Sequence, residues 1–105
     1  MNSIEITCED GDSKGRYLAR VEGMSEVAEL SFSKASAAFV IADHTTVPGA
    51  MRGRGIGAML AARLVDDARH GAYRILALCP FVRAQFARHP EWADVMWTDR
   101  GAHSA

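Results

Sequence analysis

An apolar stripe at helical spacing directly follows a stretch rich in glycine and arginine, and this junction restricts the fold more than any other feature of the sequence. The stripe predicts an amphipathic helix over residues 56–70 that must bury one face against other elements, with Gly71 as its C′ stop. The apolar positions of that face are Ile56, Leu60, Ala61, Leu64, Val65 and Ala68.

The predicted helix begins without a capping side chain. No Ser, Thr, Asp or Asn occurs between Pro48 and Gly57, although such residues normally accept a hydrogen bond from the first free N–H groups of a helix. The segment Arg52-Gly53-Arg54-Gly55-Ile56-Gly57 instead brings flexible backbone and two positive charges to the positive end of the helix dipole. This combination is typical of an anion-binding site.

Strand-like patterns lie on both sides of this helix. Four short strands joined by short links predict an antiparallel meander, at residues 3–9, 15–21, 27–32 and 36–43. Residues 73–79 are apolar on both faces except at Arg74, which favours a strand parallel to the fourth and a right-handed βαβ crossover. Pro80 fits the first position of a further short helix, residues 81–88, which Pro90 ends.

Length and charge limit the classes of protein that fit. A chain of 105 residues predicts one domain, 1–105, with a polar and frayed tail at 98–105. The order of the predicted strands and helices indicates the fold class α/β, or α+β in some schemes, with a mixed sheet. Twelve basic and 13 acidic residues give a net charge of −1, which argues against nucleic acid as a partner. No apolar run approaches the ~20 residues that cross a bilayer, so we expect no membrane association.

The two cysteines predict neither a disulfide nor a metal site. Cys8 and Cys79 are far apart and match no metal-ligand spacing, and no secretory signal is recognisable. We therefore expect a cytoplasmic protein without a bound metal.

Two common phosphate-binding motifs do not fit residues 51–57. The P-loop ends in Gly-Lys-Ser/Thr, and no Lys occurs after Lys34. The dinucleotide fingerprint needs Gly-x-Gly-x-x-Gly in the first βα unit, whereas here Gly53, Gly55 and Gly57 alternate and follow antiparallel strands.

A third pattern, Arg/Gln-x-x-Gly-x-Gly/Ala, fits at every specified position. It is the pyrophosphate-binding motif of the GCN5-related N-acetyltransferase superfamily, which residues 52–57 resemble. "DHTTVPGAMRGRGIGAMLAARLVDDA" and "LCPFVRAQFARHPEW" resemble more specifically the small single-domain branch often called YjdJ-type. The resemblance extends from about the first strand to Trp92, and it also covers the order of the predicted elements.

This resemblance implies acetyl-CoA as a cosubstrate and a location for it. It implies that the fourth and fifth strands splay apart around the pantetheine arm and that the glycine-rich segment binds the pyrophosphate of coenzyme A. The residues expected to bind coenzyme A are Thr46, Val47, Arg52, Gly53, Arg54, Gly55, Ile56 and Gly57.

Two side chains at the expected ends of those strands are candidates for catalysis. Cys79 immediately precedes a predicted helix, and a helix N-terminus favours a thiolate, so it is a candidate acyl acceptor or proton donor to the departing coenzyme A. Cys79 can equally be a small buried apolar residue. His44 is the candidate base for an acceptor amine, and the parallel strand register can bring it near Cys79. The alternative for His44 is a solvated structural residue.

The resulting hypothesis is an acetyl-CoA-dependent acyltransferase acting on an amine, by direct transfer or through Cys79. The chain lacks the helices that follow the first strand in larger members of the superfamily, which favours a bulky acceptor such as a protein or peptide. The rival hypothesis is a non-catalytic coenzyme A-binding or protein-interaction module, since no carboxylate base is evident near the site.

Overall fold

A single mixed sheet forms the framework of the computed structural model, which describes residues 3–97. Within that range five strands lie in chain order, β1 (Ile4–Asp10), β2 (Lys14–Val21), β3 (Val27–Lys34), β4 (Phe39–Thr46) and β5 (Arg74–Ala77). The first four pair antiparallel, and β5 pairs parallel with β4. The predicted meander and the predicted parallel pairing are both confirmed, whereas the expected tail at 98–105 lies outside the described residues.

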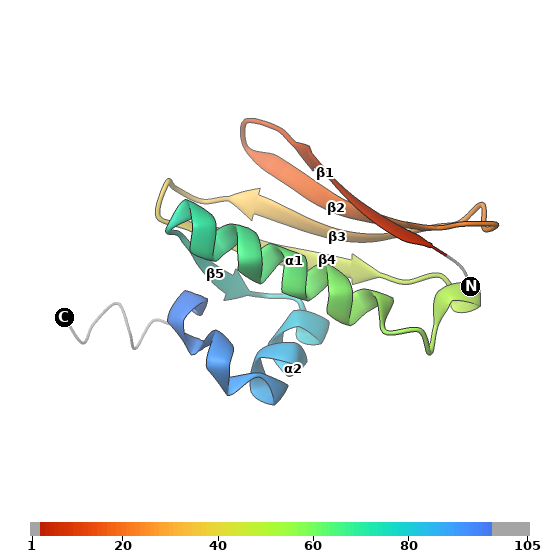
Figure 1. The fold of residues 1–105 in the computed structure, drawn as a ribbon. Helices are drawn as coiled ribbons and strands as arrows, with labels where there is room; N and C mark the ends of the chain where they lie inside the picture. The colour runs from red at the N-terminus through yellow and green to blue at the C-terminus, as the bar shows by residue number, and fades with distance from the viewer. Residues whose placement is uncertain (1–2, 98–105) are drawn as a thin grey trace.

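Helix α1 (Ile56–Gly71) joins β4 to β5 and lies along one face of the sheet (Figure 1). All six positions of the predicted apolar stripe are buried in the core, where α1 packs on β2, β3 and β5. Across the sheet this core includes Tyr17 and Phe32, whose ring centroids are 5.4 Å apart. Burial of this stripe fixes α1, and therefore its glycine-rich start, relative to the end of β4.

The helix ends one residue later than predicted. Ala72, not Gly71, adopts the left-handed conformation, with φ 58° and ψ 41°. Gly71 is needed for a different reason, because a Cβ at this position would lie 2.6 Å from Cε2 of the Tyr73 ring. The Ala72 N–H then donates to the Arg69 carbonyl and the Tyr73 N–H to the Ala68 carbonyl, which closes the helix in a Schellman-type turn.

Every predicted strand has somewhat different bounds in the structure, and the differences in β4 and β5 concern the residues discussed below. The turn after β3 is formed by residues 35–38, because the N–H groups of Ala35 and Ser36 both donate to the Phe39 carbonyl. Strand β4 therefore begins later than predicted and continues to Thr46. Strand β5 has four residues and ends at Ala77, so Cys79 lies beyond the strand rather than on it.

Two helices follow β5, and only the first was predicted. Helix α2 (Pro80–Arg88) has Pro80 in its first turn, as expected. After it comes the 3-10 helix η2 (Pro90–Val95), where a simple helix stop was predicted. The His89 ring stacks on Trp92 with centroids 4.1 Å apart, and the Trp92 N–H donates to the His89 carbonyl, so the segment coils into a further turn.

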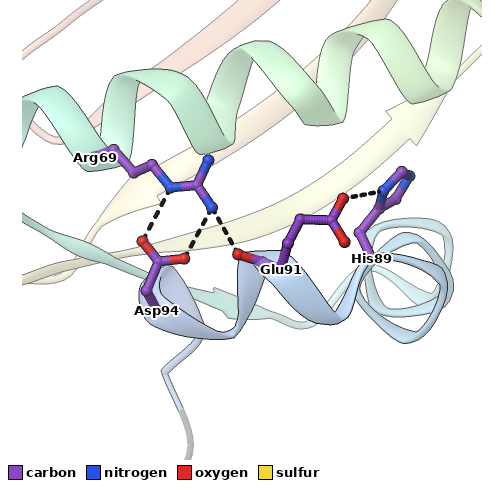
Figure 2. A network of polar contacts seen from close by, with 4 residues as sticks. All are labelled: Arg69, His89, Glu91 and Asp94. Atoms are coloured by element: carbon purple, nitrogen blue, oxygen red, sulfur yellow. Dashed lines mark hydrogen bonds and ion pairs between the residues drawn. The ribbon is translucent and has the colours of Figure 1, made fainter.

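Polar contacts attach η2 to the last turn of α1 (Figure 2). The Arg69 guanidinium donates to both carboxylate oxygens of Asp94 at 2.9 Å and to the Glu91 carbonyl at 2.8 Å. Arg69 thereby lowers the pKa of the Asp94 carboxyl below its ordinary value, and the contact with His89 lowers the pKa of Glu91. These contacts hold the segment after α2 against α1.

Candidate functional site

The start of α1 presents N–H groups that have no partner in the described part of the chain. The N-cap residue is Gly55, in the left-handed conformation at φ 73°, and no side chain caps the helix. The first main-chain hydrogen bond of the helix runs from the Met59 N–H to the Gly55 carbonyl. Among residues 3–97, the N–H groups of Ile56, Gly57 and Ala58 therefore have no acceptor.

Two glycines keep the approach to these N–H groups open. Gly53 and Gly55 have positive φ angles of 81° and 73°. Residues other than glycine, Asn and Asp rarely adopt this backbone conformation. A Cβ built on either residue would have no atom within 4 Å. The backbone here therefore borders open space, which a bulky ligand can approach without meeting a side chain.

This open backbone forms one wall of a cavity of about 480 Å³. The other walls come from the end of β4 with the loop after it and from one face of α2. The lining consists of Thr45, Val47, Met51, Arg52, Gly53, Gly55, Ile56, Gly57, Ala58, Phe81, Gln85 and Arg88. Two arginines and no carboxylate are among these residues, so the charge of the lining favours an anion.

Six of the eight residues predicted to bind coenzyme A line this cavity, and Thr46 and Arg54 do not. Thr46 is exposed at the end of β4 and pairs with Glu29, and Arg54 is exposed beside the cavity. Sequence reasoning missed the α2 wall, formed by Phe81, Gln85 and Arg88. Their spacing of four and then three residues is a helical face, a signal that was available in the sequence.

The Cys79 thiol lies beside this cavity. Cys79 is the N-cap residue of α2, only 4% exposed, and its Sγ is 3.3 Å from Oγ1 of Thr45. Pairing of β4 with β5 ends at Ala42 and Ala77, and the N–H groups of Leu78 and Cys79 both donate to the Ala42 carbonyl. Strand β4 therefore continues past the end of β5. Helix α2 follows β5 at the point where β5 would otherwise continue alongside β4.

The structure does not bring His44 to Cys79. A β-bulge inserts Asp43 between two consecutive residue pairs of β3 and β4, Phe32 with Ala42 and Ser31 with His44. Thr45 pairs with the buried Leu30 and so faces the core, whereas His44 shares the opposite face with Ser31. His44 is exposed and lines a hollow with Lys14, Ser31, Ser33 and Asp43.

A sequence model of the GCN5-related N-acetyltransferase family matches residues 16–95. The chain belongs to this family. The matched range contains the whole cavity lining, Cys79 and His44, so the family assignment and the candidate site concern the same residues. No curated protein matches the chain in sequence.

A solved structure supports the fold of this N-acetyltransferase family member. The NMR structure of a "GCN5-like putative N-acetyltransferase" from Staphylococcus aureus superposes with a TM-score of 0.66 at 24% identity, covering 94% of this chain and 95% of that one. The mixed five-stranded sheet between residues 3 and 97 therefore has the same fold as that structure.

Metal-binding clusters and membrane-spanning helices are both absent from the described part of this family member. Among residues 3–97, no group of three or more His, Cys, Asp or Glu side chains is arranged to hold a metal ion. No helix in the same range is both long and apolar enough to span a membrane.

Proposed function

We propose that this chain transfers an acetyl group from acetyl-CoA to an amine. The observation that carries the proposal is the start of α1, where three free N–H groups and two open glycines form a wall of a cavity with two arginines. Pyrophosphate is the anion that such a helix start binds well, since its oxygens accept several N–H hydrogen bonds and its charge favours the positive helix end.

Each part of the cavity has a role in this proposal. The N–H groups of residues 56–58 donate to the pyrophosphate, and Arg52 adds a charged contact. Arg54, at the exposed rim, adds positive charge, and the backbone at Thr46 and Val47 borders the pantetheine arm. Arg88 supplies a second cation across the cavity.

Acetyl-CoA supplies an acetyl group that its thioester activates toward nucleophiles. Cys79 serves one of two roles, giving its proton to the departing coenzyme A thiolate or accepting the acetyl group before the amine does. Thr45 positions the Cys79 thiol through their mutual hydrogen bond. His44 takes the proton of the acceptor amine, which requires the acceptor to approach from the face of the sheet opposite Thr45.

Calorimetric titration with coenzyme A tests the binding step. Gly55→Asp adds a negative charge at the free helix start, and Asp tolerates the left-handed conformation that Gly55 adopts. We expect this variant to lose measurable binding while remaining folded. Gly23→Asp is the matched control, because Gly23 also has positive φ, 86°, and open space, and lies outside the cavity lining. Equal affinity in Gly55→Asp and the wild type would refute the proposed pyrophosphate site.

A non-catalytic coenzyme A-binding module is the second candidate. It is favoured by the absence of a carboxylate among the cavity-lining residues, since no acidic general base faces the ligand there. Incubation with acetyl-CoA followed by intact mass measurement and a free-thiol assay separates the two functions. A gain of one acetyl group that Cys79→Ala abolishes supports the two-step enzyme, and thiol release that needs the added amine and leaves no acetyl group on the protein supports the direct one. Tight binding with neither result supports the module.

The acceptor that we propose is an amine on a protein or peptide. Leu78, the neighbour of Cys79 in sequence, is an exposed apolar side chain, at 55%, which a flanking segment of a large acceptor can cover. A panel of lysine-containing peptides and free small amines, with coenzyme A release as the readout, tests this. Turnover with small amines alone would contradict a macromolecular acceptor.

A further inference from the structure

One buried polar side chain in the cavity wall has no hydrogen-bond partner among the residues that the structure describes. Gln85 is only 6% exposed, which makes it the buried polar residue of the described core. Its amide forms no hydrogen bond with any residue between 3 and 97, whereas buried polar groups are normally paired.

The side chain of Gln85 lines the cavity. No side-chain nitrogen or oxygen that is fully buried lacks a partner in the described residues, so the unpaired amide atoms of Gln85 retain contact with open space. Gln85 lines the cavity together with Phe81 and Arg88, which lie on the same face of α2. The open space that its amide reaches is therefore the cavity.

The position of Gln85 suits a neutral ligand group better than a phosphate. The cations Arg52 and Arg88 and the free N–H groups of α1 already provide for negative charge. A carboxamide both donates and accepts a hydrogen bond, and it therefore complements another amide. The pantetheine arm of coenzyme A carries two amide groups, and it is the part of the molecule between the pyrophosphate and the thioester.

We propose that Gln85 is a specificity-determining residue that hydrogen-bonds an amide of the pantetheine arm. This inference rests on the proposed function, because it assumes that coenzyme A occupies the cavity. Binding of the arm then satisfies an amide that the fold otherwise leaves unpaired, so the cavity selects acyl carriers with an amide at this distance from the pyrophosphate.

Paired titrations of coenzyme A and of adenosine 3′-phosphate 5′-diphosphate test this role. The second ligand keeps every phosphate and lacks the arm. Gln85→Met preserves the unbranched shape of the side chain and removes the amide. We expect it to raise the Kd for coenzyme A roughly threefold to tenfold, the effect of one hydrogen bond, and to leave the Kd for the armless ligand unchanged.

Arg83→Met is the matched control, because Arg83 is exposed on the same helix and lies outside the cavity lining. Unchanged binding of the armless ligand by Gln85→Met also shows that this variant is folded. Wild-type affinity of Gln85→Met for coenzyme A, or an equal loss for both ligands, would overturn the role of Gln85 alone. A wild-type protein that binds neither ligand would overturn the proposed function as well.

Discussion

The ring of Phe81 occupies the space that a side chain at Gly57 would need, since a Cβ built on Gly57 would lie 2.6 Å from Cζ of Phe81. The first turn of α1 and the first turn of α2 are therefore in direct contact at the cavity. Glycine at this position permits close packing of the two helix starts, in addition to any ligand contact.

The contact between Gly57 and Phe81 predicts that substitutions at these two positions have non-additive effects on the free energy of unfolding. Gly57→Ala alone should change the free energy of unfolding little, because the helix propensity of Ala, worth about 1 kcal/mol, is offset by displacement of Phe81. In a Phe81→Leu background the same substitution should stabilise the protein by about 1 kcal/mol. Urea denaturation of the four proteins in the cycle measures this coupling. Equal gains in both backgrounds would contradict it.

Removal of the Thr45 hydroxyl should slow acetyl transfer without weakening coenzyme A binding. Thr45→Val keeps the shape of the side chain and removes the partner of the Cys79 thiol, 3.3 Å away. Loss of one such hydrogen bond corresponds to a rate about tenfold lower. Thr7→Val is the control, because Thr7 lies on β1 and outside the cavity lining. Equal rates for the Thr45 and Thr7 variants would contradict a positioning role.

Replacement of Ala72 by glycine should stabilise the protein. Ala72 ends α1 in the left-handed conformation, at φ 58°, which costs an L-residue roughly 1–2 kcal/mol and glycine little. We expect Ala72→Gly to raise the free energy of unfolding by about 1 kcal/mol in chemical denaturation. Ala62→Gly, inside α1, should lower it by a similar amount. A loss of stability in Ala72→Gly would refute this account of the helix end.

The buried Tyr17 should make the fold sensitive to alkali. Burial, together with the 2.6 Å hydrogen bond that its hydroxyl donates to Asp67, raises the pKa of Tyr17 above its ordinary value of about 10. As the pH rises above about 10, the unfolded chain loses this proton before the folded one, so stability falls by up to about 1.4 kcal/mol per pH unit. Urea midpoints between pH 9 and 11.5 should decline less steeply in Tyr17→Phe. An identical decline in both proteins would exclude Tyr17 as the cause.

The sequence predicts the helix and the glycine-rich start well, because both depend on local patterns. Six apolar positions at helical spacing define α1, and the lack of a capping side chain before Gly57 identifies its free N–H groups. The α2 wall depends instead on packing between elements. In the sequence Gln85 is an ordinary polar residue of a predicted helix. Only the fold shows that its side chain is buried, at 6% exposure.

Helix ends and strand register are less accessible to sequence reasoning. Gly71 is the obvious residue for a left-handed stop, but the ring of Tyr73 requires glycine there for steric reasons and moves the turn to Ala72. The neighbours of Cys79 depend on pairing between β3 and β4, and no local pattern in residues 39–46 marks the extra residue.

That extra residue has a consequence for how such a site changes over time. Asp43 is left out of the residue pairing with β3, so loss of its codon would leave His44 opposite Ser31 and Thr45 opposite Leu30. Strict alternation would return to β4, the hydroxyl would stay beside the sulfur, and the imidazole would stay on the other face of the sheet. The site can therefore tolerate a one-residue deletion at this bulge, whereas deletion of a paired residue of β4 would turn the residues after it to the opposite face.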